Sequence, residues 1–111
     1  MILPFKIKQH DLQPYYPFSV PEADSLTGAT IVCTMVDVLT GTKKIDRQAA
    51  GCVITDAASR EAEYRWQASD TDTAGKFKIE FEITPPSGGK FTVPSGSEVA
   101  YVIISSDLDG V

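Results

Sequence analysis

Hydrophobic and polar residues alternate along several stretches of the chain, most clearly over residues 76–84. In that stretch Phe77, Ile79, Phe81 and Ile83 fall on one side, and Lys and Glu residues fill most positions between them. Successive side chains of a strand point to opposite faces of its sheet. The pattern therefore predicts a strand with one buried face and one charged, solvated face.

A second alternating stretch covers residues 61–67, where the apolar residues, among them Tyr64 and Trp66, are predicted to face inward. Residues 29–38 and 99–105 are nearly all apolar, Thr or Ser. Continuous apolar runs of this length are typical of strands that are buried on both sides. We therefore expect both segments to be central strands covered on both faces.

Weaker strand patterns occur at residues 5–8, 48–55 and 91–93, and turns rich in Gly, Pro and Ser separate the segments. Residues 15–21 contain two prolines, which favours an extended edge segment over a central strand. No window of twelve or more residues keeps a helical period. The sequence thus predicts an all-β fold, either a sandwich or a barrel.

The composition is that of an ordinary globular protein, with 111 residues of which 42% are hydrophobic and 23% are charged. This length supports one hydrophobic core, so we expect a single domain over residues 1–111. The N-terminal apolar run is too short for the core of a signal peptide, and no stretch approaches membrane-spanning length. The expected place of synthesis is the cytoplasm.

The formal net charge is -5, and the ten Lys and Arg residues are scattered along the sequence. Nucleic acids and anionic membranes both require clustered positive charge. Neither is therefore an expected partner.

Two cysteines, Cys33 and Cys52, are predicted to be reduced, buried thiols on neighbouring strands. A disulfide between them requires that the two strands lie face to face at the right spacing. Two cysteines and the one histidine cannot form a structural zinc site without carboxylates. We expect no metal and no cofactor.

Candidate catalytic residues are few. His10 and Asp11 are neighbours, but no nucleophile motif accompanies them, so a solvated turn is the favoured interpretation. Asp70 and Asp72 resemble the start of a calcium loop, but the closing glutamate is missing at the required distance. A turn between two strands is favoured there too, and the chain is not expected to be an enzyme.

One cluster of residues stands apart as a candidate contact surface for a partner protein. Tyr15, Tyr16, Phe18 and Val20 lie in the segment that the prolines bound. If these apolar side chains are exposed, they form the kind of patch that marks a protein contact. The alternative is that they close one open end of the sandwich.

Several segments, taken in order, resemble the immunoglobulin-like N-terminal domain of tailed-phage baseplate upper proteins and related small phage virion proteins. In that family a Leu-Thr-Gly-Ala strand start is followed by a Tyr-x-Trp strand, an Asp-Thr turn and a Gly-aromatic strand. The matching segments here are residues 25–31, 63–66, 70–71, 74–81, 91–94 and 99–104. The similarity covers residues 5–107, nearly the whole chain.

The resemblance implies an immunoglobulin-like antiparallel β-sandwich of seven to eight strands and a non-enzymatic role in a phage virion, in the tail, baseplate, neck or head. The partners would be other virion proteins and further copies of the chain. In two respects the chain departs from the family: residues 15–18 replace a polar, Gly-containing hairpin, and the sequence ends just after the domain. An antibody-type domain is disfavoured because Trp66 follows both cysteines instead of lying between them.

An alternative from another functional class is a carbohydrate- or host-surface-binding module. Such a module requires exposed aromatic rings on a concave face, whereas the alternation assigns Tyr64 and Trp66 to the core.

Overall fold

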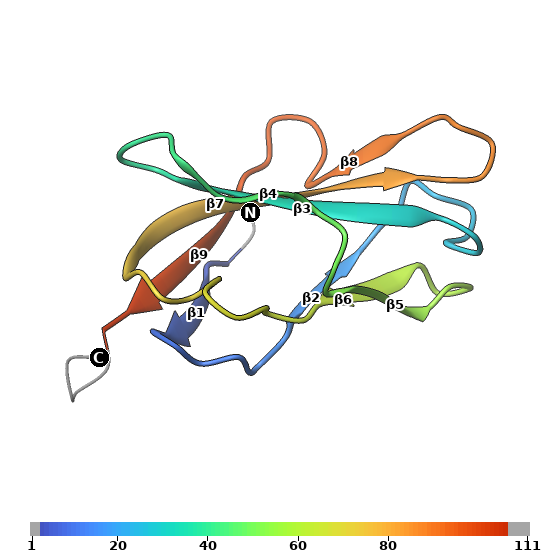
Figure 1. Ribbon diagram of the computed structural model, residues 1–111. Helices are drawn as coiled ribbons and strands as arrows, with labels where there is room; N and C mark the ends of the chain where they lie inside the picture. The colour runs from blue at the N-terminus through green and yellow to red at the C-terminus, as the bar shows by residue number, and fades with distance from the viewer. Residues whose placement is uncertain (1–2, 107–111) are drawn as a thin grey trace.

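The computed structural model describes residues 3–106, which form nine β-strands in two sheets (Figure 1). The all-β prediction is confirmed, and the number of strands exceeds the seven to eight expected. Within these residues no helix is long and apolar enough to cross a membrane. In chain order the strands are β1 (Phe5–Lys8), β2 (Tyr16–Ser19), β3 (Thr30–Asp37), β4 (Lys43–Gln48), β5 (Cys52–Asp56), β6 (Glu61–Tyr64), β7 (Gly75–Thr84), β8 (Phe91–Val93) and β9 (Ala100–Ser105).

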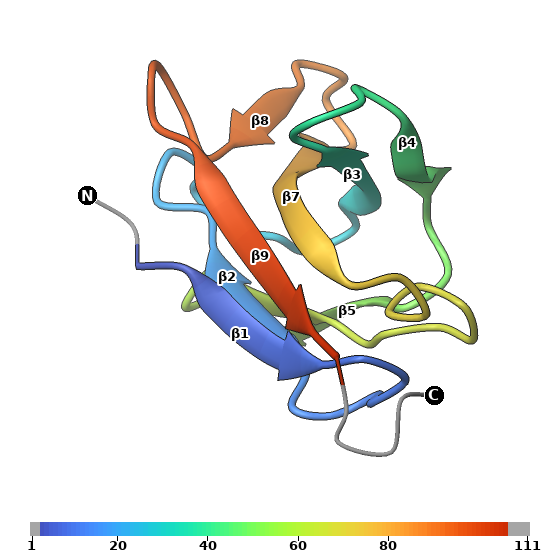
Figure 2. The same cartoon turned by 90° about the vertical axis from the view of Figure 1, so that its left-hand side faces the viewer.

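The larger sheet has the order β1-β9-β7-β3-β4, and β8 pairs with β7 as well. The two halves of β7 have different neighbours on one side: Gly75 to Ile79 pair with β9, and Phe81 to Ile83 pair with β8. Strand β1 runs parallel to β9, and Figure 2 shows the two side by side. The sheet is therefore mixed, which corrects the expectation of a purely antiparallel sandwich.

Strand β7 confirms the alternation that predicted it. Phe77, Ile79, Phe81 and Ile83 are all buried, while most of the Lys and Glu residues between them are exposed. β7 pairs with β3 over eight residues on its other side, so it lies in the interior of the larger sheet. The strand with the clearest sequence pattern is thus the one around which the larger sheet is built.

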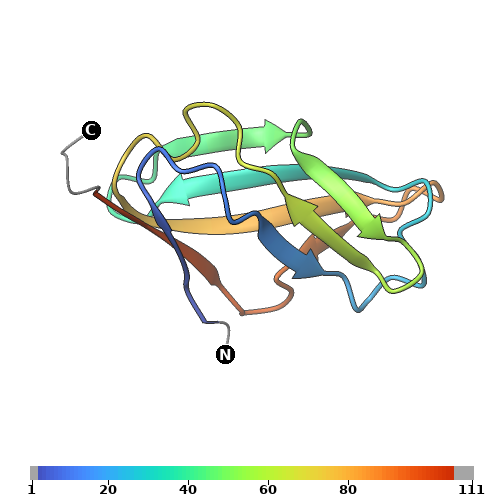
Figure 3. The ribbon, with the colours of Figure 1, turned by 90° about the horizontal axis from the view of Figure 1, so that it is seen from below.

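The smaller sheet has the order β2-β6-β5 and lies across β3 and β7 (Figure 3). Its inner face carries Tyr16, Ala62 and Tyr64, which are buried. Strand β2 is at one edge of this sheet, as the prolines predicted.

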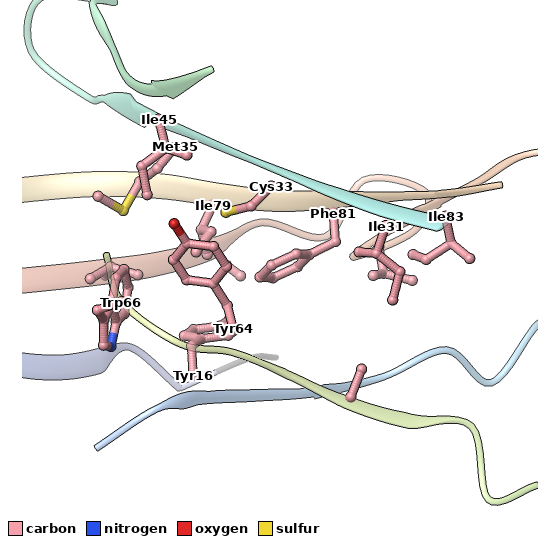
Figure 4. Close-up of a cluster of buried hydrophobic side chains, with 14 of the residues drawn as sticks. Tyr16, Ile31, Cys33, Met35, Ile45, Tyr64, Trp66, Ile79, Phe81 and Ile83 are labelled. Carbon is pink, nitrogen blue, oxygen red and sulfur yellow. The ribbon is translucent and has the colours of Figure 1, made fainter. Parts of the chain in front are cut away.

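Side chains from both sheets fill the space between the layers (Figure 4). Aromatic rings dominate the middle of this core: Tyr64 meets Trp66 edge to face, with centroids 5.4 Å apart, and Tyr16 packs on Phe81 at 5.7 Å. Tilted and edge-to-face pairs of this kind are the favoured arrangements of neighbouring rings. The inward assignment of Tyr64 and Trp66 is confirmed.

The expectation that residues 29–38 and 99–105 are covered on both faces is wrong for one face of each. In β3 and β9 the residues that face the smaller sheet are buried, whereas Val32, Val36 and Ile103 on the opposite face are half-buried. The sandwich has two layers only, so within residues 3–106 no further sheet covers the outside of the larger one, and only the loop of residues 94–99 reaches over part of it. The many apolar and β-branched residues of these two segments therefore reflect the preference of such residues for strands, and they do not show that both faces are buried.

The segment 48–55 is not one strand. The chain forms β4 before it, turns at residues 49–51, and continues as β5 in the other sheet. Strand β4 escaped prediction because Ile45 is its one buried residue and most of the others are polar or charged. Gly51 allows the sharp turn, since its φ of +93° is one that L side chains rarely adopt.

Gly51 and Gly88 have nearly equal positive φ angles, but only Gly51 is closely surrounded by other atoms. Replacing each by Ala therefore distinguishes the cost of backbone strain from the cost of a steric clash. A Cβ on Gly51 would lie 2.5 Å from the carbonyl oxygen of Arg65, whereas a Cβ on Gly88 (φ +96°) would meet nothing within 4 Å. We expect Gly88→Ala to cost about 1 kcal/mol. Gly51→Ala should cost at least about 2 kcal/mol more, because backbone must move. Urea unfolding of the two variants measures the difference, and equal losses would contradict this assignment.

Candidate docking surface

The structure divides the four predicted contact residues into two pairs. Tyr16 and Val20 belong to the core, with exposed fractions of 8% and 0%. Tyr16 packs against Phe5, with ring centroids 5.1 Å apart, as well as against Phe81. Their side chains are thus packed inside the sandwich and do not form an exposed patch.

Tyr15 and Phe18 are half-buried and reach the surface at two separate places. The guanidinium group of Arg65 lies 5.1 Å from the centre of the Tyr15 ring. The Phe18 ring stacks on Phe81 of the other sheet, with centroids 3.8 Å apart and planes 10° from parallel. Phe18 therefore joins the two sheets at their margin and leaves part of its ring accessible there.

This margin is hollowed into a cavity of about 240 Å³, which we call the lateral groove. It opens between the edge strand β2 and the β8–β9 side of the larger sheet. Apolar and aromatic side chains make up most of its lining. The lining residues are Tyr16, Pro17, Phe18, Ser19, Phe81, Val93, Pro94 and Ala100.

The groove exists because the two sheets differ in width. The smaller sheet ends at β2, and no further strand of the described chain pairs with the outer edge of β2. Unpaired strand edges can accept a strand from another molecule. Pro17 limits this capacity, since it removes one N–H donor from a strand of four residues. Side-chain contacts in the groove are therefore the main way for a partner to bind there.

The groove was only partly predictable from sequence. The Pro-bounded segment pointed to Phe18, but Phe81, Val93 and Ala100 gave no functional signal because their alternation marks them as core. Their part in the groove depends on how far the smaller sheet extends over the larger one. No local pattern encodes that extent.

The candidate catalytic pair does not form a catalytic arrangement. His10 is exposed in the turn after β1, with a φ of +70°, and its backbone N–H donates to the carbonyl oxygen of Thr71. Asp11 is exposed as well, and its carbonyl oxygen accepts a hydrogen bond from the hydroxyl of Thr71. Both residues thus serve to hold the β1–β2 connection against the β6–β7 connection.

The two aspartates of the possible calcium loop are engaged by protein donors. Asp70 is buried, and its Oδ2 accepts hydrogen bonds from the hydroxyl of Tyr64 at 2.6 Å and from the backbone N–H of Gln67 at 2.7 Å. Asp72 pairs with Lys44 and Thr73. The carboxylates point to different neighbours, which favours the turn interpretation. Across residues 3–106 no group of three or more His, Cys, Asp or Glu side chains is placed to hold a metal ion.

Tyr64 is the centre of the buried polar network. Its hydroxyl donates to Asp70 and accepts a hydrogen bond of 2.8 Å from the side-chain amide of Gln48 at the end of β4. Burial, together with the carboxylate of Asp70, raises the pKa of Tyr64 above its ordinary value. The hydroxyl of Tyr64 therefore stays protonated and can donate its hydrogen bond to the buried carboxylate of Asp70.

Cys33 and Cys52 are both free thiols, as expected, but only Cys33 is buried, Cys52 is half-buried, and the two do not lie on neighbouring strands of one sheet. Cys33 is on β3 of the larger sheet and Cys52 is on β5 of the smaller one. Burial raises the pKa of the Cys33 thiol, and it raises that of Cys52 to about 12. Thiols protonated to this degree are poor nucleophiles.

The sequence matches no protein-family model and no curated protein.

We expect Tyr64→Phe to destabilise the fold by about 2 kcal/mol, because it leaves a buried carboxylate without its hydroxyl donor. The matched control is Tyr101→Phe, since the hydroxyl of Tyr101 makes no hydrogen bond within residues 3–106. That change should stay within about 0.5 kcal/mol of wild type. Chemical denaturation followed by Trp66 fluorescence measures both, and a Tyr64 variant as stable as the control would refute the structural role.

Stability should fall as the pH rises above about 9. The pKa values of Cys33 and Cys52 are raised above the ordinary value of 9.0, so the folded state holds these protons more tightly than the unfolded state. The stabilisation is complete below the unfolded pKa and is lost as the pH rises through the folded one. Urea midpoints at about pH 8 and 10 test this. The Cys33→Ala/Cys52→Ala variant should lose less over that interval, and an equal loss would exclude the thiols as the cause.

Proposed function

We propose that the chain is a non-enzymatic structural protein of a phage virion, and that it works by docking onto neighbouring proteins in the tail, baseplate, neck or head. The observation that carries the proposal is the lateral groove, an apolar hollow beside an unpaired strand edge that a second polypeptide can fill. The resemblance of several ordered segments to the N-terminal domain of phage baseplate upper proteins indicates the kind of assembly. The protein would be made in the host cytoplasm.

We further propose that the sandwich is immunoglobulin-like. In that fold one sheet contains the strands A, B, E and D and the other contains G, F and C, with C′ added in variable-type domains. The orders β2-β6-β5 and β9-β7-β3-β4 follow the same sequence of strands. Strand β1 is the counterpart of strand A, but it pairs with β9 in the larger sheet and does not join β2 in the smaller one.

The positions that carry the resemblance have structural roles consistent with it. Gly28 precedes β3 and Gly75 begins β7, so both stand where the chain enters a long strand. Tyr64 and Trp66 fill the space between the sheets, and Asp70 fixes the turn that leads into β7. These roles are consistent with the proposed fold, and the phage assignment depends on the motifs themselves.

The carbohydrate-binding alternative receives less support. Trp66, Tyr64, Phe77 and Phe81 are buried, and the lateral groove is lined by Phe and Pro with few polar groups to recognise hydroxyls. Screening the chain against a glycan array tests this alternative directly. Specific binding of a sugar would replace docking as the favoured function.

Quantitative mass spectrometry of tailed particles, purified from a culture that carries the gene, tests the proposed function. We expect the chain in the particles at a fixed copy number that matches a symmetric part of the virion. Its absence from intact particles would overturn the proposal.

A matched pair of variants tests the groove. Ser19→Arg places a long cation at the groove rim, whereas Ser87→Arg makes the same change in the exposed turn between β7 and β8. Both should fold with stabilities within about 0.5 kcal/mol of wild type. We expect Ser19→Arg alone to lower incorporation into particles by about tenfold or more, which corresponds to about 1.4 kcal/mol of binding energy. Equal incorporation of the two variants would remove the groove from the docking site.

A further inference from the structure

The outside of the larger sheet, which we call the outer face, carries an ordered row of charges along β7. Lys76 and Lys78 occupy one half of the row, and Glu80 and Glu82 occupy the other. All four side chains point away from the core, because they alternate with the buried residues of the strand. The charge therefore changes sign at the level of Ile79.

Residues of the neighbouring strands lie on the outer face directly beside the charged residues of β7. Tyr101 of β9 and Val36 of β3 flank Lys78, while Thr34 of β3 flanks Glu80. Lys6 of β1 pairs with Ile103, which stands next to Lys76. The Lys half of the outer face thus contains a third lysine, and half-buried Tyr101 and Ile103 lie between the charges.

Some charged side chains of the outer face form ion pairs within the chain, and others do not. Glu82 pairs with Arg47 at 2.8 Å and with Lys90 at 3.3 Å, and these contacts hold the pKa of its carboxyl below the ordinary value. Lys78 and Glu80 form no ion pair within residues 3–106. The two charges next to the sign change are therefore available to another molecule.

We infer that the outer face binds a second copy of this chain, related by a two-fold axis that runs between the two faces, perpendicular to β7 at the level of Ile79. This axis reverses the strand direction, so Lys78 of each copy faces Glu80 of the other. A two-fold contact uses the same patch twice, and a row of opposite charges arranged about its centre is self-complementary. The inference deepens the proposed function, since it names one contact of the assembly.

The uncharged residues of the outer face fit the same arrangement. Reversal about Ile79 places Val36 opposite Thr34 and Tyr101 opposite Val99 of the second copy. Val99 is 40% exposed and lies in a hollow of about 320 Å³ that also includes Val36, Pro94 and Glu98. The loop of residues 94–99 rises from the outer face (Figure 1) and would reach the Lys half of the second copy with the acidic Glu98.

Charge reversal tests the arrangement through its symmetry. Lys78→Glu creates two repulsive contacts in a pair of copies, and so does Glu80→Lys. A mixture of these two variants instead restores both attractive contacts. We expect each variant alone to associate at least about tenfold more weakly than wild type, and the equimolar mixture to form heterodimers of near wild-type affinity.

Sedimentation equilibrium up to about 1 mM measures all of these species. Glu61→Lys, on the exposed face of the smaller sheet, is the control and should associate like wild type. A monomeric wild-type chain, or a mixture no heavier than its separate variants, would overturn the inference. Weakening by Lys78→Glu but not by Glu80→Lys would overturn it too, because Lys78 would then face an acidic group of the second copy other than Glu80.

The same variants separate this inference from the proposed function. If they fail to alter self-association but the chain is present in purified particles at a fixed copy number, the outer face is excluded and the virion role stands. If self-association follows the predicted pattern but the chain is absent from particles, the two-fold contact stands and the virion role is excluded.

Discussion

The hydrogen bond between the hydroxyl of Tyr64 and the carboxylate of Asp70 is the contact on which the rest of the structure depends. Tyr64 stands at the end of β6 in the smaller sheet, Gln48 reaches it from β4 in the larger sheet, and Asp70 lies in the connection between β6 and β7. One side chain therefore joins both layers and the crossover between them. A buried carboxylate without such donors would be strongly unfavourable, so the network also fixes which turn the chain can adopt.

The segment around Asp70 also holds two connections together at one end of the sandwich. The hydroxyl of Thr71 donates to the carbonyl oxygen of Asp11, and the side-chain amide of Gln9 donates to that of Asp72. Through these bonds the β1–β2 connection is held against the start of β7. This keeps β1 beside β9 even though the two strands are far apart in the sequence. These polar contacts thus add to the direct pairing of β1 with β9, which the backbone N–H of Gln9 extends by donating to the carbonyl oxygen of Ser105.

The sequence predicted those features that local alternation encodes. Strand β7 and the inward positions of Tyr64 and Trp66 could be recognised because each residue repeats the pattern of its neighbours. Strand β4 could not, since a polar edge strand with one buried residue, Ile45, resembles a loop. The parallel pairing of β1 also escaped, because pairing partners distant in sequence leave no local signal. The same limit explains the lateral groove, which Phe18 forms together with a residue 63 positions later, Phe81.

The predicted contact segment illustrates how one sequence pattern can serve two purposes. Its alternation sends Tyr16 and Val20 into the core and leaves Tyr15 and Pro17 outside, so the segment is first of all an edge strand. Within this segment, Phe18 alone both packs against the core and stays partly accessible, because it lies where the smaller sheet stops. The groove beside it and the charged outer face are adjacent surfaces, since one opens at the margin between the sheets, the other covers the outside of the larger sheet, and Pro94 and Ala100 line the hollows of both. A chain with two such surfaces can contact a copy of itself through one and a different protein through the other, which a component inside a symmetric particle has to do.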